Sequence, residues 1–88
     1  MRILFVEDDK NIAHFVKKGL EESYFIVDMA YDGEEGLYLA LHERYDLLIL
    51  DIMLPKMDGI DILEQTETRR IQCILYSRYH IFGANLAD

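Results

Sequence analysis

The chain has 88 residues, enough for one small domain, and 51% of them are apolar, so it can bury a hydrophobic core. Its 17 acidic and 9 basic residues give a formal net charge of −8, which argues against direct nucleic-acid binding by this segment. One cysteine, Cys73, excludes an internal disulfide and suits a reducing compartment. Early acidic residues argue against a signal peptide, and no apolar run could span a membrane, so we expect a soluble cytosolic domain.

The N-terminal part of the sequence combines short apolar runs with a helical period. Residues 3–6 (ILFV) form a continuous apolar run, which is typical of a strand buried on both faces. Apolar residues then recur every four positions from Ile12 to Leu20, which predicts an amphipathic helix with Asp9 as its N-cap. Residues 25–27 (FIV) predict a second strand.

The next segment repeats this alternation. Asp32, followed three residues later by Glu35, predicts the capped start of a second helix, and its apolar face includes Leu37 and Ala40. Residues 47–50 (LLIL) predict a third strand, which we expect to be central because it is the most apolar of the strands.

A third helix and a fourth strand complete the recognisable pattern. Residues 55–59 predict a loop, and Asp58 predicts the N-cap of a helix that buries Ile60 and Leu63, with Ile62 as a further candidate. Residues 73–76 (CILY) predict the fourth strand. Strands alternating with helices at this spacing indicate βαβ units and a parallel sheet.

Three carboxylates are expected at one edge of this sheet. Glu7 and Asp8 follow the first strand, and Asp51 follows the third. If these strands are neighbours, the three acids converge where ligands of parallel α/β sheets bind. Such a cluster favours a hard cation such as Mg²⁺, and a carboxylate beside the metal can act as a nucleophile that forms an aspartyl-phosphate.

The runs VEDD (residues 6–9) and LILDIMLPKMDG (residues 48–59) resemble the receiver domain of two-component response regulators, most of all the receivers that precede winged-helix DNA-binding domains. The likeness is close over about residues 1–65. It implies a flavodoxin-like fold with strand order 2-1-3-4-5. It also implies that a histidine kinase phosphorylates Asp51 with the help of Mg²⁺, so that the domain works as a switch and not as a turnover enzyme.

The resemblance also implies roles for individual residues. Asp51 is the phosphoacceptor, and Ser77 matches the residue that senses the phosphoryl group. Glu7 and Asp8 form the acidic pocket, in which Asp8 ligates Mg²⁺ directly. The backbone carbonyl of Met53 is a further ligand.

Residues 66–88 depart from the family pattern. They supply no counterpart of the family's fourth helix, of its fifth strand with a conserved lysine, or of its fifth helix, so we expect about four strands and three helices. The fourth strand would then be a sheet edge, and we expect a homo-oligomer that forms through residues 71–82. One alternative is a truncated receiver that acts as a binding or oligomerisation module with weak or no phosphotransfer. Another is that residues 66–88 are not native to the domain.

Overall fold

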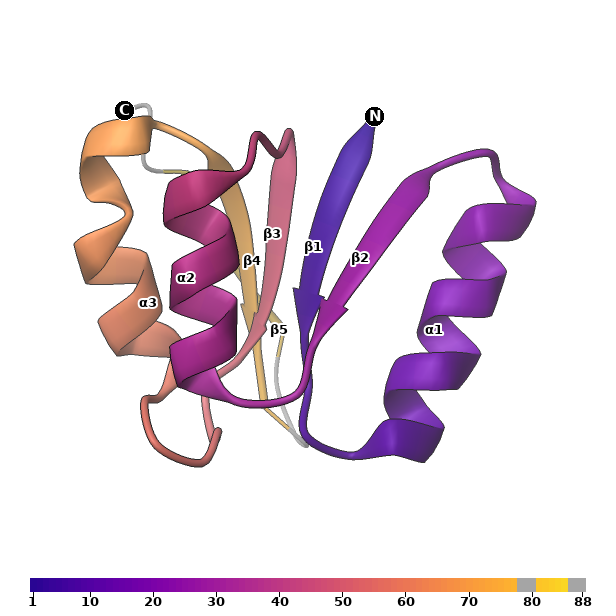
Figure 1. The fold of residues 1–88 in the computed structure, drawn as a ribbon, viewed down its shortest axis with the longest axis horizontal. Helices are drawn as coiled ribbons and strands as arrows, with labels where there is room; N and C mark the ends of the chain where they lie inside the picture. Colours follow the sequence, from indigo (N-terminus) through magenta and orange to yellow (C-terminus); the bar gives the residue numbers. More distant parts are fainter. Residues whose placement is uncertain (78–80, 86–88) are drawn as a thin grey trace.

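The computed structural model describes residues 1–77 and 81–85, and within them five strands form one sheet in the order β2-β1-β3-β4-β5 (Figure 1). The strands are β1 (Arg2–Val6), β2 (Ile26–Ala30), β3 (Leu47–Asp51), β4 (Gln72–Tyr76) and β5 (Ile81–Asn85). The helices are α1 (Lys10–Glu22), α2 (Gly33–His42) and α3 (Gly59–Gln65), followed by the 3-10 helix η1 (Glu67–Arg69). Strands β1 to β4 are parallel, which confirms the predicted incomplete flavodoxin-like sheet with β3 in its centre.

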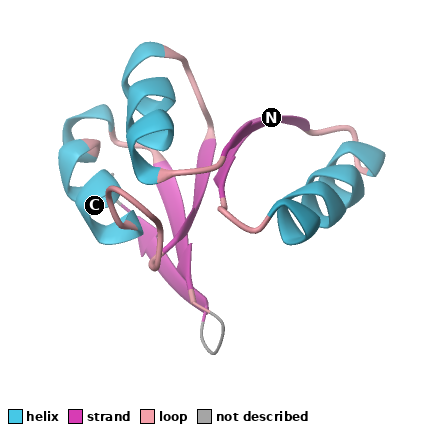
Figure 2. Ribbon diagram, turned by 60° about the horizontal axis from the view of Figure 1, so that its bottom comes forward, coloured by secondary structure: helices cyan, strands magenta, loops and turns pink. Residues whose placement is uncertain are grey.

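The sheet lies between helices on its two faces (Figures 1 and 2). Side chains alternate along each strand. On β1, Leu4 and Val6 pack in the cluster under α2 and α3, whereas Ile3 and Phe5 belong to the cluster on the α1 side. This two-sided burial explains why the strands are continuous apolar runs. None of the helices in the described part of the chain has the length and apolarity needed to cross a membrane.

The predicted N-caps are all confirmed. The carboxylate of Asp9 accepts hydrogen bonds from the backbone N–H groups of residues 11 and 12, that of Asp32 from residue 35, and that of Asp58 from residue 61. Each cap satisfies donors that the first turn of a helix leaves unpaired. Each therefore fixes where the chain turns from a strand or loop into a helix.

The predicted buried faces of α1 and α3 are confirmed except at the first apolar residue of each. The later apolar residues pack against the core as predicted: Val16, Leu20 and Leu63. Ile12 is 43% exposed, whereas its neighbour Ala13 is fully buried against the sheet. In α3, Ile60 is 43% exposed and Ile62 is fully buried. The apolar period identifies each helix and most of its buried face, but packing against the strands decides which residue of the first turn is buried.

Thr66 forms the C-cap of α3, and it is fully buried. Its hydroxyl donates to the carbonyl of Ile62, at 2.8 Å. This bond satisfies the polar atom inside the core, so a threonine is tolerated there.

The expectation that β4 forms an edge of the sheet is wrong. Strand β5 pairs with β4 in antiparallel register, from Tyr76↔Ile81 to Gln72↔Asn85. Only residues 77–80 connect the two strands, whereas a parallel crossover needs a dozen or more residues. The chain therefore returns as a hairpin and does not form the family's parallel fifth strand.

Gly59 is required by the close approach of two segments. A Cβ atom on Gly59 would lie 2.4 Å from the carbonyl oxygen of Asp51, a backbone atom that a side-chain rotation cannot move away. The start of α3 is thus held directly against the end of β3. Gly19, on the outer part of α1, has no such neighbour within 4 Å.

We predict opposite effects for alanine at these two glycines. Gly59→Ala should lower the free energy of unfolding by about 1–3 kcal/mol, because the backbone must shift to accept the methyl group. Gly19→Ala should be neutral or stabilising by up to about 1 kcal/mol, because alanine is the better helix former. Urea unfolding of both variants measures this, and equal stabilities would contradict the proposed contact between α3 and β3.

Candidate functional site

Three carboxylates meet at the carboxyl edge of the sheet, as the sequence predicts. Strand β1 pairs with β3 so that Val6 lies opposite Leu50, and the next residues along the two strands are Glu7 and Asp51. Together with Asp8, they offer ligand oxygens that all lie within 4.8 Å of one another. The convergence follows from the parallel pairing of β1 with β3.

Glu7 is the buried member of the cluster, only 3% exposed. Its backbone N–H donates to the carbonyl of Ala30 on β2, at 3.0 Å. One side-chain oxygen, Oε2, accepts a hydrogen bond from the backbone N–H of Asp9 at 2.9 Å, and the other, Oε1, accepts one from the hydroxyl of Tyr76. The carboxylate is therefore fixed from both sides.

Burial is the main cause of the pKa shifts of Glu7 and Tyr76. Desolvation raises the pKa of Glu7 above its usual value, the hydrogen bonds from Tyr76 and Asp9 work in the opposite direction, and the charge of Asp51 raises it further. Burial, then the bond to Glu7, raises the pKa of Tyr76 well above that of a free phenol. Tyr76 thus remains a protonated donor throughout the physiological pH range.

Asp51 and Asp8 are more accessible than Glu7. Asp51 is partly exposed, and its Oδ1 accepts the backbone N–H of Met53 at 3.0 Å. The loop that follows is tied down by two further backbone bonds, from Ile52 to the carbonyl of Tyr76 and from Gly59 to that of Ile52. Asp8 is exposed to solvent, so the cluster is open to water and to small solutes.

Ser77 lies at the same edge of the sheet. Tyr76 stands opposite Asp51 in the β3–β4 register, and Ser77 is the next residue, partly exposed. The assignment of Ser77 to phosphoryl contact, and of the Met53 carbonyl to metal ligation, remain predictions. Of the predicted oligomer segment, residues 78–80 lie outside the described residues.

The cluster has the chemistry that Mg²⁺ requires. All the candidate ligand atoms are oxygens, and the exposure of Asp8 leaves room for the waters that Mg²⁺ usually retains. A divalent cation would also relieve the mutual repulsion of the carboxylates. Glu7, Asp8 and Asp51 are the side chains that fit this ion.

Tyr76 was missed by the sequence analysis. Within the run CILY it is expected only as part of a buried strand, and nothing in the local pattern indicates that its hydroxyl reaches Glu7, which lies 69 positions away. Only the three-dimensional placement of β4 relative to β1 reveals this contact.

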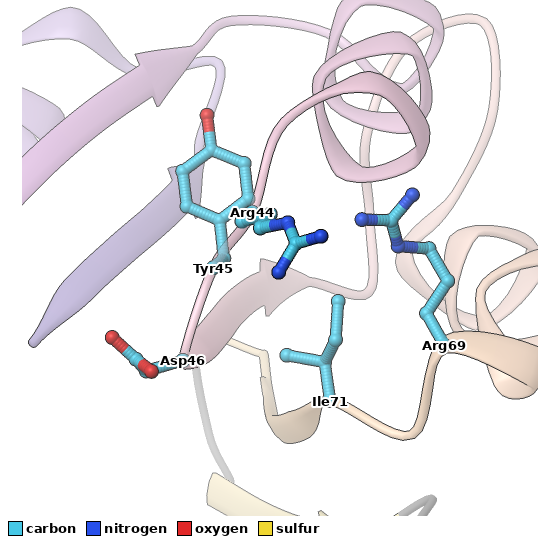
Figure 3. Close-up of a pocket in the computed structure, with 5 residues that line it drawn as sticks. All are labelled: Arg44, Tyr45, Asp46, Arg69 and Ile71. Atoms are coloured by element: carbon cyan, nitrogen blue, oxygen red, sulfur yellow. The ribbon is translucent and has the colours of Figure 1, made fainter.

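A pocket at the opposite edge of the sheet has a structural explanation. It is lined by Arg44, Tyr45, Asp46, Arg69 and Ile71, which lie near the amino ends of β3 and β4 (Figure 3). The guanidinium of Arg69 donates to the carbonyls of Leu41 and Glu43, so it satisfies acceptors at the C-terminal end of α2.

Comparison with known proteins places the chain in a family. Residues 3–81 match the response regulator receiver domain, and the chain belongs to this family. It is 47% identical over 70 residues to the transcriptional regulatory protein HprR of Escherichia coli (strain K12), a match that covers 80% of this chain and 31% of HprR. It is 49% identical over 63 residues to CusR of the same strain, covering 72% of this chain and 28% of CusR. The resemblance to the receivers of transcription regulators is thus confirmed.

Solved structures agree with this assignment. The response regulator TrrA from Thermotoga maritima, solved in complex with Mg²⁺-BeF, matches with a TM-score of 0.83 and 35% identity, covering 89% of this chain and 70% of that one. The receiver domain of a sensor histidine kinase from Pseudomonas aeruginosa PAO1, solved with a magnesium ion in its active site cleft, matches with a TM-score of 0.80 and 27% identity. This match covers 84% of the present chain and 64% of the other one. The chain spans about a third of the curated relatives it matches.

We predict that Mg²⁺ raises the melting temperature of the chain and that the effect depends on the acidic cluster. A ligand at ~100 times its dissociation constant adds about 2.7 kcal/mol of stability. Asp51→Asn should melt higher than the wild type without Mg²⁺, because it removes one of the repelling charges, and should gain less when Mg²⁺ is added.

The control is Asp46→Asn, the same change at an exposed residue of the opposite edge, which should retain the full response to Mg²⁺. Equal Mg²⁺ shifts in the wild type and in Asp51→Asn would place the bound ion elsewhere. Differential scanning fluorimetry or circular dichroism provides the melting temperatures.

Proposed function

We propose that this chain is a phosphoacceptor receiver, in which Asp51 accepts a phosphoryl group from the histidine of a kinase with the help of Mg²⁺. The observation that carries the proposal is the convergence of the ligand oxygens of Glu7, Asp8 and Asp51 within 4.8 Å. Membership of the receiver family supports it, as do the magnesium-containing structures of similar proteins.

In the transfer step, a carboxylate oxygen of Asp51 attacks the phosphorus atom of a phosphohistidine. The O–P bond forms while the N–P bond breaks, and the electron pair remains on the imidazole nitrogen, which takes up a proton from water. The product is an acyl phosphate on Asp51. Mg²⁺, when bound, supplies neutralising charge to the phosphoryl oxygens.

The residues of the chain position the reacting groups. Met53 holds one oxygen of Asp51 through its backbone N–H, which limits rotation of the carboxylate. Glu7 and Asp8 provide oxygen ligands for the ion, with the carbonyl of Met53 as a further one. The hydroxyl of Ser77 contacts a phosphoryl oxygen from the end of β4. Each Asp51 takes up one phosphoryl group, so the domain acts as a switch and not as a turnover enzyme.

The partner implied by this chemistry is a histidine kinase. Some relatives are named transcriptional regulatory proteins, and the present chain corresponds to about a third of their length. With its net charge of −8, this segment is not suited to bind the DNA backbone itself. We infer that it receives the signal and that contact with DNA belongs to other parts of such proteins.

Incubation with acetyl phosphate and Mg²⁺ tests the proposal directly. We predict that intact mass spectrometry detects one added phosphoryl group, which hydroxylamine removes because it is held as an acyl phosphate. Asp51→Asn should show no adduct, while Asp46→Asn should react like the wild type. Adduct formation on Asp51→Asn, or none on the folded wild type with Mg²⁺ bound, would refute the assignment.

Self-association is a second candidate function, and the α1 face of the sheet favours it. Helix α1 packs against β1 and β2, while Ile49 of β3 and Ile74 of β4 remain partly exposed. Because these apolar side chains lie on the inner strands of the sheet, a second copy could cover them. Because β5 pairs with β4, the edge of β4 no longer favours pairing with a second copy. The partly exposed face of the sheet still does.

We predict that sedimentation velocity at micromolar concentration finds a dimer and that Ile74→Lys shifts it to monomer. Lysine in this position places a charge in the proposed interface. The control is Ile60→Lys on α3, which is already exposed and lies on the opposite side of the sheet. A monomeric wild type would exclude self-association, and an intact dimer of folded Ile74→Lys would place the interface elsewhere.

A further inference from the structure

The side chain of Tyr76 bridges two strands that are not neighbours. Tyr76 belongs to β4, and its hydroxyl donates to Oε1 of Glu7, which follows β1, so the side chain passes over the end of β3 between them. Its ring lies against that of Phe5, with centroids 6.0 Å apart and planes inclined by 40°. Phe5 lies on β1 and Glu7 directly follows the strand, two residues further along the chain, and Tyr76 contacts both. The ring contact with Phe5 thus aims the hydroxyl at the carboxylate.

The backbone of Tyr76 is also tied to the site. Its carbonyl accepts the N–H of Ile52, the residue that follows Asp51, at 2.9 Å. In the β3–β4 register, Tyr76 stands directly opposite Asp51 itself. One residue therefore contacts the buried acid through its side chain and the segment carrying Asp51 through its backbone.

We propose that Tyr76 is a positioning residue of the acidic cluster, whose hydroxyl fixes the Glu7 carboxylate in the orientation that accepts a divalent cation. This inference rests on the proposed function, because it assumes that the cluster binds Mg²⁺. The hydroxyl of Tyr76 and the backbone N–H of Asp9 each donate to one oxygen of Glu7, so the orientation of the carboxylate is fixed at both oxygens. Partners that orient metal ligands in this way are typically worth a factor of 10–100 in metal affinity.

The hydrogen-bond donor that Tyr76 offers to Glu7 is uncharged. Residues 57–88 contain no lysine, and the donor that the structure shows on Oε1 of Glu7 is the neutral hydroxyl of Tyr76. A tyrosine hydroxyl orients Glu7 without adding a positive charge that would compete with the metal ion. Its role is therefore to place the ligand and not to neutralise it.

The test is a Mg²⁺ titration of the full chain, followed by NMR through the backbone amides of residues 8, 9 and 53. Tyr76→Phe removes the hydroxyl and keeps the ring, and we expect its dissociation constant for Mg²⁺ to rise about tenfold or more. The matched control is Tyr45→Phe. Tyr45 is buried, and its hydroxyl likewise donates to a carboxylate, that of Asp28, at 2.7 Å, away from the acidic cluster.

The control separates positioning from a general loss of stability. Both variants lose a hydrogen bond between a phenol and a carboxylate, so both should melt lower than the wild type. Only Tyr76→Phe should bind Mg²⁺ more weakly. Unchanged affinity in folded Tyr76→Phe, or an equal loss in both variants, would overturn the inference while leaving the proposed function intact. Absence of Mg²⁺ binding in the wild type would overturn both.

A second measurement covers the case in which Tyr76→Phe does not fold. In the wild-type chain, the ring resonances of Tyr76 should shift with Mg²⁺ along the same binding curve as the amide of Asp8, and those of Tyr45 should not move. Tyr76 resonances that stay constant while the Asp8 amide titrates would also overturn the inference, because a hydroxyl bound to a metal ligand must sense the ion.

Discussion

The parallel pairing of β1 with β3 is the constraint on which the rest of the structure depends. It brings Glu7 and Asp51 to one edge, because parallel strands in register end together. The same pairing requires that the strands be connected over the faces of the sheet, which places α1 and α2 on opposite sides. The fold and the acidic cluster thus have one cause, and a shift in the β1–β3 register would disturb both.

Placing carboxylates together has an energetic cost that the surrounding groups reduce. A buried carboxylate without partners would lose several kcal/mol of hydration, and Glu7 is almost fully buried. The N–H of Asp9 and the hydroxyl of Tyr76 replace the lost waters. The compensation is incomplete, because desolvation and, to a smaller extent, the charge of Asp51 still raise the pKa of Glu7. A bound cation at this edge of the sheet would reduce the remaining repulsion between the carboxylates.

Much of this arrangement could be predicted from the sequence because it follows from local rules. Buried strands show as apolar runs, helix starts as aspartates, and the site as acids directly after two strands. The burial in the first turns of α1 and α3 could not be predicted, since the helical period alone does not choose between Ile12 and Ala13 or between Ile60 and Ile62. The contact of Tyr76 with Glu7 depends on the order of three strands, and no pattern within β4 carries that information.

The hairpin at the end of the chain has a direct consequence for the site. A parallel fifth strand would bring its carboxyl end to the acidic edge, but the four residues between β4 and β5 are too few for such a crossover. Antiparallel β5 instead begins beside Tyr76 and carries Asn85 to the far edge, opposite Gln72. Among the described residues, the end of β4 therefore supplies the side chain that reaches the cluster from this side of the sheet: the hydroxyl of Tyr76 binds Glu7, and Ser77 is the next residue along the chain.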